Sequence, residues 1–157
     1  CAIAVQKPIR ILPEEQDMIR FYDDNGALVM RLRNETLRIE GWGKNALRVR
    51  ATKLKQMPEH CHALTEEVSH SSQIAIDPEK KCAEISNGII RATVNEVGII
   101  CFYRCDKLIL QEYYSCYGGS IRKESICYKI FSREYKGNSS DDFRITVRFE
   151  SDPDEKL

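Results

Sequence analysis

Apolar and polar side chains alternate along most of this chain with a period of two residues. The stretch from Glu35 to Glu40 alternates leucine and isoleucine with arginine and glutamate, and the stretch from Asn45 to Thr52 repeats the pattern. Such alternation is typical of strands that bury one face. Roughly ten short segments of this kind, separated by polar turns, are predicted as strands. They cover residues 27–33, 35–40, 45–52, 73–76, 82–86, 89–94, 98–104, 107–112, 126–135 and 143–150.

Short strands with one apolar face predict antiparallel sheets packed face to face, which is an all-β, antiparallel β-sandwich. The dipeptide Asn87-Gly88, between two alternating segments, predicts a two-residue hairpin turn with positive φ at both positions. No long helix is predicted. Residues 54–70 have weak helical character, which Pro58 and three histidines interrupt.

The chain of 157 residues has the length of one domain, which we place at residues 18–157. Residues 1–17 lack the strand pattern and are interpreted as an N-terminal arm or a cloning remnant. Twenty-four basic residues balance 24 acidic ones, so charge gives no reason to expect nucleic acid or a membrane surface as a partner. No apolar run has membrane-spanning length, and the first residues do not resemble a signal peptide.

The cysteines indicate a reducing compartment. There are seven, an odd number at irregular spacing, and no two form a Cys-x-x-Cys pair. Most lie in apolar stretches, so we predict reduced, mostly buried thiols and a cytoplasmic location. Cys101 and Cys105 would share one strand face, but without a second pair they are interpreted as core thiols and not as zinc ligands.

Two groups of side chains are weighed as sites. His60-Cys61-His62, with His70 nearby, could form half of a metal site, but no carboxylate completes the set. We interpret it as a structural or solvated loop, and we expect neither a metal nor another cofactor.

Aromatic residues form the second group. Tyr113, Tyr114 and Tyr117 precede Gly118-Gly119, and Trp42 stands between two glycines. These four are carbohydrate-stacking candidates, and the alternative is that they pack at the end of a sheet. No catalytic residue is predicted, because no carboxylate couple and no nucleophile with its base stand out.

Three stretches, in order, resemble the N-terminal region of glycoside hydrolase family 31, the α-glucosidases and α-xylosidases. The first runs from Leu37 to Lys53 and is similar to an early strand pair of the family. The second, from Ala83 to Glu112, resembles the next unit, which contains the Asn-Gly hairpin. The third, from Arg144 to Leu157, resembles the strand and turn that in this family run into a Tyr/Phe-Gly-x-Gly motif.

The resemblance implies a galactose-mutarotase-like sandwich, truncated at its C-terminal end, that precedes a catalytic (β/α)8 barrel. In the family, two barrel carboxylates perform retaining α-glycoside hydrolysis, so it implies an accessory domain that is inactive alone and has the barrel as its partner. A free-standing carbohydrate-binding or mutarotase-like module and a purely structural domain remain alternatives. Strands missing from a truncated sandwich would leave open edges, so we expect a homo-oligomer, with residues Ala2 to Leu12 as an exchanged arm.

Overall fold

The computed structural model describes residues 18–57, 72–113, 115–117, 128–130, 133–137 and 143–150. Every regular element in these ranges is a strand, and every pairing between them is antiparallel. The strands are β1 (Arg20–Asp24), β2 (Ala27–Leu32), β3 (Glu35–Trp42), β4 (Ala46–Thr52), β5 (Gln73–Asp77), β6 (Cys82–Asn87), β7 (Ile90–Val94), β8 (Ile100–Arg104), β9 (Lys107–Glu112), β10 (Ser115–Tyr117), β11 (Tyr128–Ile130), β12 (Arg133–Gly137), β13 (Phe143–Val147) and β14 (Phe149–Glu150).

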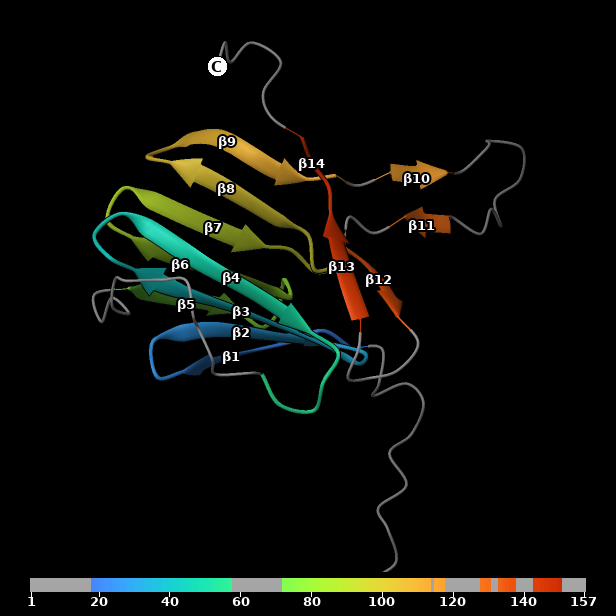
Figure 1. The fold of residues 1–157 in the computed structure, drawn as a ribbon. Helices are drawn as coiled ribbons and strands as arrows, with labels where there is room; N and C mark the ends of the chain where they lie inside the picture. Colours follow the sequence, from blue (N-terminus) through green and yellow to red (C-terminus); the bar gives the residue numbers. More distant parts are fainter. Residues whose placement is uncertain are drawn as a thin grey trace, which may run out of the picture.

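Two sheets form the body of the molecule (Figure 1). One has four strands in the order β1-β2-β3-β4, and the other has six in the order β14-β9-β8-β7-β6-β5. The four-stranded sheet packs on the six-stranded one through contacts of β2 and β3 with β6, of β4 with β7 and of β1 with β5. Two further hairpins, β10-β11 and β12-β13, stand beside this body. The predicted all-β, antiparallel β-sandwich is confirmed.

The core lies between the sheets and follows from the alternation in the sequence. On β3, Leu37 and Ile39 point into the core, while Arg38 between them points outward. On β6, Ala83 and Ile85 are buried in the same way. The fully buried core is aliphatic, and its members are Ile19, Leu28, Met30, Leu37, Ile39, Ala83, Ile85, Ala92, Val94 and Ile100.

The inner face of the six-stranded sheet reaches beyond the four-stranded one. Strand β7 of the larger sheet lies opposite β4, which is the edge strand of the smaller sheet. The next strands of the larger sheet, β8, β9 and β14, lie beyond this edge. On this extension Phe102 contacts Phe149, with ring centroids 6.3 Å apart, and Phe149 is 46% exposed. Val49 on β4 is also exposed. Apolar side chains on this part of the inner face therefore remain open to solvent in the described structure.

The hairpin at Asn87-Gly88 exists, but its turn is displaced by one residue from the prediction. Asn87 pairs with Ile90, so the two loop residues are Gly88 and Ile89. Only Gly88 has a positive φ, of 61°, and the predicted positive φ at Asn87 is wrong.

The displacement has a physical cause, because the Asn87 side chain is committed to the neighbouring turn. Its amide donates to the backbone oxygens of Trp42, Gly43 and Ala46 at 3.4, 3.2 and 2.8 Å. In return, the Asn45 side-chain oxygen accepts from the backbone N–H of Ile89 at 3.2 Å. We call these hydrogen bonds of the Asn87 and Asn45 side chains the asparagine latch. They join the β3–β4 turn of one sheet to the β6–β7 turn of the other.

The predicted strands match the structure from residue 27 to residue 112, and the ends differ. The strands β1 and β10 were not predicted. The predicted segment 126–135 contains two strands, β11 and β12. The predicted segment 143–150 is divided at Arg148 into β13, which pairs with β12, and β14, which pairs with β9. A continuous apolar pattern therefore serves two different sheets.

Several predictions fall outside the described residues. These are the interpretation of residues 1–17, the exchanged arm from Ala2 to Leu12, the histidine group at 60–62 with His70, and most of the segment 54–70. Within the described ranges, no helix has the length and apolar character that crossing a membrane requires.

Candidate functional site

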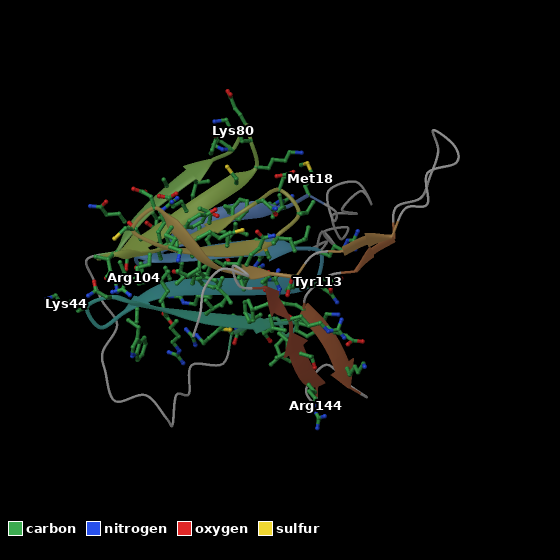
Figure 2. All side chains as sticks on the ribbon, turned by 90° about the horizontal axis from the view of Figure 1, so that it is seen from above. Met18, Lys44, Lys80, Arg104, Tyr113 and Arg144 are labelled. Carbon is green, nitrogen blue, oxygen red and sulfur yellow. The ribbon has the colours of Figure 1, made fainter. Side chains whose placement is uncertain are left out.

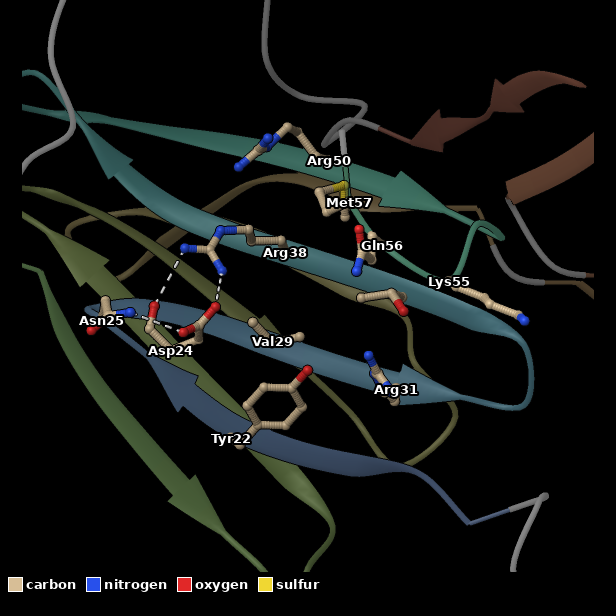
Figure 3. A pocket seen from close by; sticks show the side chains of 11 residues that line it. Tyr22, Asp24, Asn25, Val29, Arg31, Arg38, Arg50, Lys55, Gln56 and Met57 are labelled. Atoms are coloured by element: carbon tan, nitrogen blue, oxygen red, sulfur yellow. Dashed lines mark hydrogen bonds and ion pairs between the residues drawn. The ribbon is translucent and has the colours of Figure 1, made fainter. Parts of the chain in front are cut away.

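A hollow of about 880 Å³ lies on the outer face of the four-stranded sheet (Figure 3). We call it the outer hollow. Strand register builds it, because Tyr22 pairs with Val29, Val29 with Arg38, and Arg38 with Arg50. These four side chains form one row across the sheet, on the face opposite the core. Lys55, Gln56 and Met57, which follow β4, close one side.

Carboxylates form ion pairs with some of the cationic side chains of the outer hollow. Arg38 donates to Asp24 at 2.5 Å and lies 3.4 Å from Glu40. Glu40 also lies 3.0 Å from Arg50 and 3.4 Å from Arg48, and it is buried. Burial disfavours the charge of Arg38, yet Asp24 and Glu40 outweigh this effect and raise its pKa. Arg38 is therefore held in place as a charged group.

Two further cations of the outer hollow are unpaired within the described part of the chain. Neither Arg31 nor Lys55 has an ion pair there, and both line the hollow. Arg31 pairs across the strands with Arg20, so two like charges stand directly opposite each other. The ammonium of Lys55 points away from the middle of the hollow (Figure 3). Four cationic side chains and one carboxylate, that of Asp24, line this surface.

A second charged group, the Arg133 cluster, lies between the strands β3, β9 and β12. Both carboxylate oxygens of Glu112 accept from Arg133 Nη1 at 2.7 Å, and Glu35 accepts from Arg133 Nε at 2.8 Å. Arg133 also donates to the backbone oxygen of Gly98 at 2.7 Å, and the Tyr135 hydroxyl donates to Glu35 at 2.6 Å. The side chain of Arg133 is only 7% exposed.

The Arg133 cluster is suited to joining strands and not to catalysis. Burial opposes the charge of Arg133, but Glu112 and Glu35 prevail and raise its pKa. Burial and the neighbouring Glu35 raise the pKa of Tyr135 far above its usual value. Both carboxylates form ion pairs with the same guanidinium, and the adjoining cavity of about 140 Å³ is smaller than a typical ligand pocket.

Of the four predicted stacking residues, the structure describes Trp42 and Tyr113 with their side chains, and it does not bring these two together. Trp42 ends β3 beside the turns that the asparagine latch joins, whereas Tyr113 follows β9 at the opposite end of the sandwich. Figure 2 shows this separation, with Lys44 at one end and Tyr113 at the other. Arg48 covers the Trp42 ring, 4.8 Å from its centroid. Tyr114 lies outside the described residues, and Tyr117 is described only by its backbone in β10.

The predicted cysteine arrangement is only partly met. Cys82, Cys101 and Cys105 are free thiols, as expected, but none of the three is fully buried. Cys105 lies in the β8–β9 turn with φ 53°, so it does not continue the strand face of Cys101. Burial raises the pKa of Cys101. Among the described residues, no three His, Cys, Asp or Glu side chains gather as a metal site would require.

Sequence reasoning missed both charged groups. Alternation alone places Arg31, Arg38 and Arg50 on polar strand faces, but it does not say which of them become neighbours. Glu112 ends the apolar segment 107–112 at an inward position. A carboxylate at such a position is a signal that an arginine must come from elsewhere in the fold.

The fold and these surfaces define an antiparallel β-sandwich domain with a charged hollow on its outer face. No family model matches the chain. Over 89% of its length, the chain is 34% identical to an uncharacterized family 31 glucosidase of Pseudescherichia vulneris. It also matches the crystal structure of a GH31 α-xylosidase from a soil metagenome, complexed with xylose, with a TM-score of 0.70, 31% identity and 86% of the chain covered.

The chain belongs to glycoside hydrolase family 31, as the sequence resemblance indicated. It spans 28% of the length of the glucosidase and 21% of the α-xylosidase chain, so it corresponds to a minor part of each.

Proposed function

We propose that this chain is an accessory β-sandwich of a retaining α-glycosidase, an α-glucosidase or α-xylosidase, and that it supports a catalytic (β/α)8 barrel. The observation that carries the proposal is the match of 86% of the chain to only 21% of an α-xylosidase. Retaining hydrolysis needs two carboxyl groups about 5 Å apart, one as nucleophile and one as acid/base. In the described residues, Glu35 and Glu112 are brought together, but both form ion pairs with Arg133.

The test compares the isolated chain with a protein that carries the same reading frame extended to the length of its relatives. We expect no turnover of p-nitrophenyl α-glucoside or α-xyloside by the isolated chain and turnover by the longer protein. Hydrolysis by the isolated chain would contradict the proposal. Comparing the two substrates on the longer protein also decides between glucosidase and xylosidase.

The supporting role needs its own measurement. In the longer protein, Arg133→Met should lower the thermal midpoint and reduce kcat with little change in KM, because it loosens the sandwich and leaves the substrate pocket chemically intact. Lys80→Gln, on the exposed β5–β6 turn, is the control. Equal activity and stability of the two variants would argue against a supporting role.

The alternative function is a free-standing carbohydrate-binding module, and the outer hollow is the observation that favours it. In that case the isolated chain binds a sugar without any barrel. We further propose a reducing, cytoplasmic location, which the three free thiols support. Titration of the denatured chain with a thiol reagent should find close to seven free thiols, whereas three disulfides would exclude this location.

A further inference from the structure

We propose that the outer hollow binds a sugar-sized anion, a saccharide that carries a carboxylate or a phosphate. This inference stands independently of the proposed function. Three features carry it, namely positive charge without a carboxylate partner in the described ranges, an aromatic side chain beside that charge, and a volume within the range of small-ligand sites.

The charge of the outer hollow favours an anion. Asp24 and Glu40 both form ion pairs with Arg38, and Glu40 also pairs with Arg50, while Arg31 and Lys55 have no carboxylate partner among the described residues. Clefts that collect one sign of charge concentrate oppositely charged ligands. A neutral sugar would leave this charge uncompensated, so the hollow distinguishes anions from neutral molecules.

Arg31 is the side chain that would contact the anionic group. Its cross-strand neighbour is Arg20, and like charges directly opposite on one sheet face are destabilising. A carboxylate or phosphate beside Arg31, which lines the hollow, would offset this repulsion. The planar guanidinium can also donate two parallel hydrogen bonds to either group. Lys55, whose ammonium points away, would strengthen the field without a contact (Figure 3).

The ring of Tyr22 provides a surface for the ring of the ligand. Tyr22 is 39% exposed and pairs with Val29, which places it diagonally next to Arg31 on the same face. An exposed aromatic ring next to a fixed charge suits a ligand with one apolar ring face and one charged substituent. The side chains of Asn25, Thr36 and Gln56, which also line the hollow, can hydrogen-bond ring hydroxyl groups.

The experiment measures binding of four probes to the 157-residue chain by isothermal titration calorimetry at low salt. The probes are glucuronate, glucose 6-phosphate, glucose and inorganic phosphate. We expect glucuronate or glucose 6-phosphate to bind at least about tenfold more tightly than glucose. Whichever of the two binds more tightly identifies the source of the charge. Equal binding of glucose and the anionic sugars, or no binding of either anionic sugar, would overturn the proposal.

Variants assign the contacts. Arg31→Gln should weaken binding of the anionic sugar about tenfold, and Tyr22→Ala should weaken the sugar but not inorganic phosphate. Arg104→Gln, an exposed arginine at the end of β8, is the matched control and should bind like the parent. Unchanged affinity in Arg31→Gln, or inorganic phosphate binding as tightly as glucose 6-phosphate, would contradict the assignment. Equal thermal midpoints of all variants verify that they are folded.

Discussion

The backbone at Gly88 leaves no room for a side chain. A Cβ there would lie 2.1 Å from Asn45 Oδ1 and 2.7 Å from the backbone oxygen of Lys44, and φ is 61°. We predict that Gly88→Ala lowers the free energy of unfolding by about 2 kcal/mol, measured by urea denaturation. Gly26→Ala is the control, because φ is also positive but no atom lies within 4 Å of its Cβ. It should cost only about 1 kcal/mol, and equal losses would mean that the clash is unimportant.

The raised pKa of Tyr135 should make the stability of the fold depend on pH at alkaline values. Burial and Glu35 raise its pKa in the folded state, whereas the unfolded phenol titrates near pH 10. The folded state then holds its proton more tightly, so this contribution is complete below about pH 10 and is lost as pH rises above it. We expect Tyr135→Phe to lose stability less steeply than the parent between pH 9 and about pH 11. Parallel stability curves for the two proteins would refute the coupling.

At the scale of elements, Arg133 attaches the β12–β13 hairpin to the sandwich. Arg133 and Tyr135 provide the polar contacts of this hairpin with β3 and β9. Arg133→Met would leave Glu112 buried without its cation, at a cost of about 3 kcal/mol. We predict faster amide hydrogen exchange in β12 and β13, and little change at Leu37 in β3. Uniform acceleration in both regions would show that the cluster stabilises the whole domain and not the hairpin alone.

The sequence predicted the elements whose partners are adjacent in the chain. Between residues 27 and 112, alternation and turn residues were sufficient, because each strand pairs with its sequence neighbour. The strand β1 was missed because RFYDD offers only Phe21 to the core, and it becomes a strand by pairing with β2 across Asn25-Gly26, where both φ values are positive. Division of the last segment at Arg148 depends on β9, which lies far away in the sequence.

The charged groups depend even more on register. Tyr22, Val29 and Arg38 become neighbours because two successive hairpin turns fix the pairing of three strands. Local alternation identifies the face of each residue, and only the assembled sheet identifies its neighbours. Conversely, Trp42 and Tyr113 were both stacking candidates because each lies near a glycine turn, and the topology separates them by the length of the sandwich.

At the scale of the whole molecule, the extension of the six-stranded sheet exposes apolar surface that a second molecule would bury. Phe149 is exposed beside Phe102, which packs against the core, and Val49 is exposed on β4, the edge strand of the smaller sheet. We propose that the isolated chain forms a symmetric dimer through this face. Light scattering at micromolar concentration should find twice the monomer mass of 18.1 kDa, and a monomer at every concentration would refute the proposal.

Phe149→Ser should shift the chain toward the monomer. Ile89→Ser is the control, since Ile89 is similarly exposed but lies in a turn of the β6–β7 hairpin. A dimer that survives Phe149→Ser unchanged would place the contact elsewhere, for example at an open sheet edge.

The asparagine latch also has a consequence for the order of folding. Asn87 and its acceptors in the β3–β4 turn are 41 to 45 residues apart, and each hairpin forms from local contacts. The latch closes only when the two sheets meet, so it reports on docking and not on hairpin formation. If docking follows the rate-limiting barrier, Asn87→Ala will speed unfolding and leave the folding rate unchanged; if docking precedes it, folding itself will slow. The effect of Asn87→Ala on the two rates thus shows whether the two sheets dock before or after the rate-limiting step of folding.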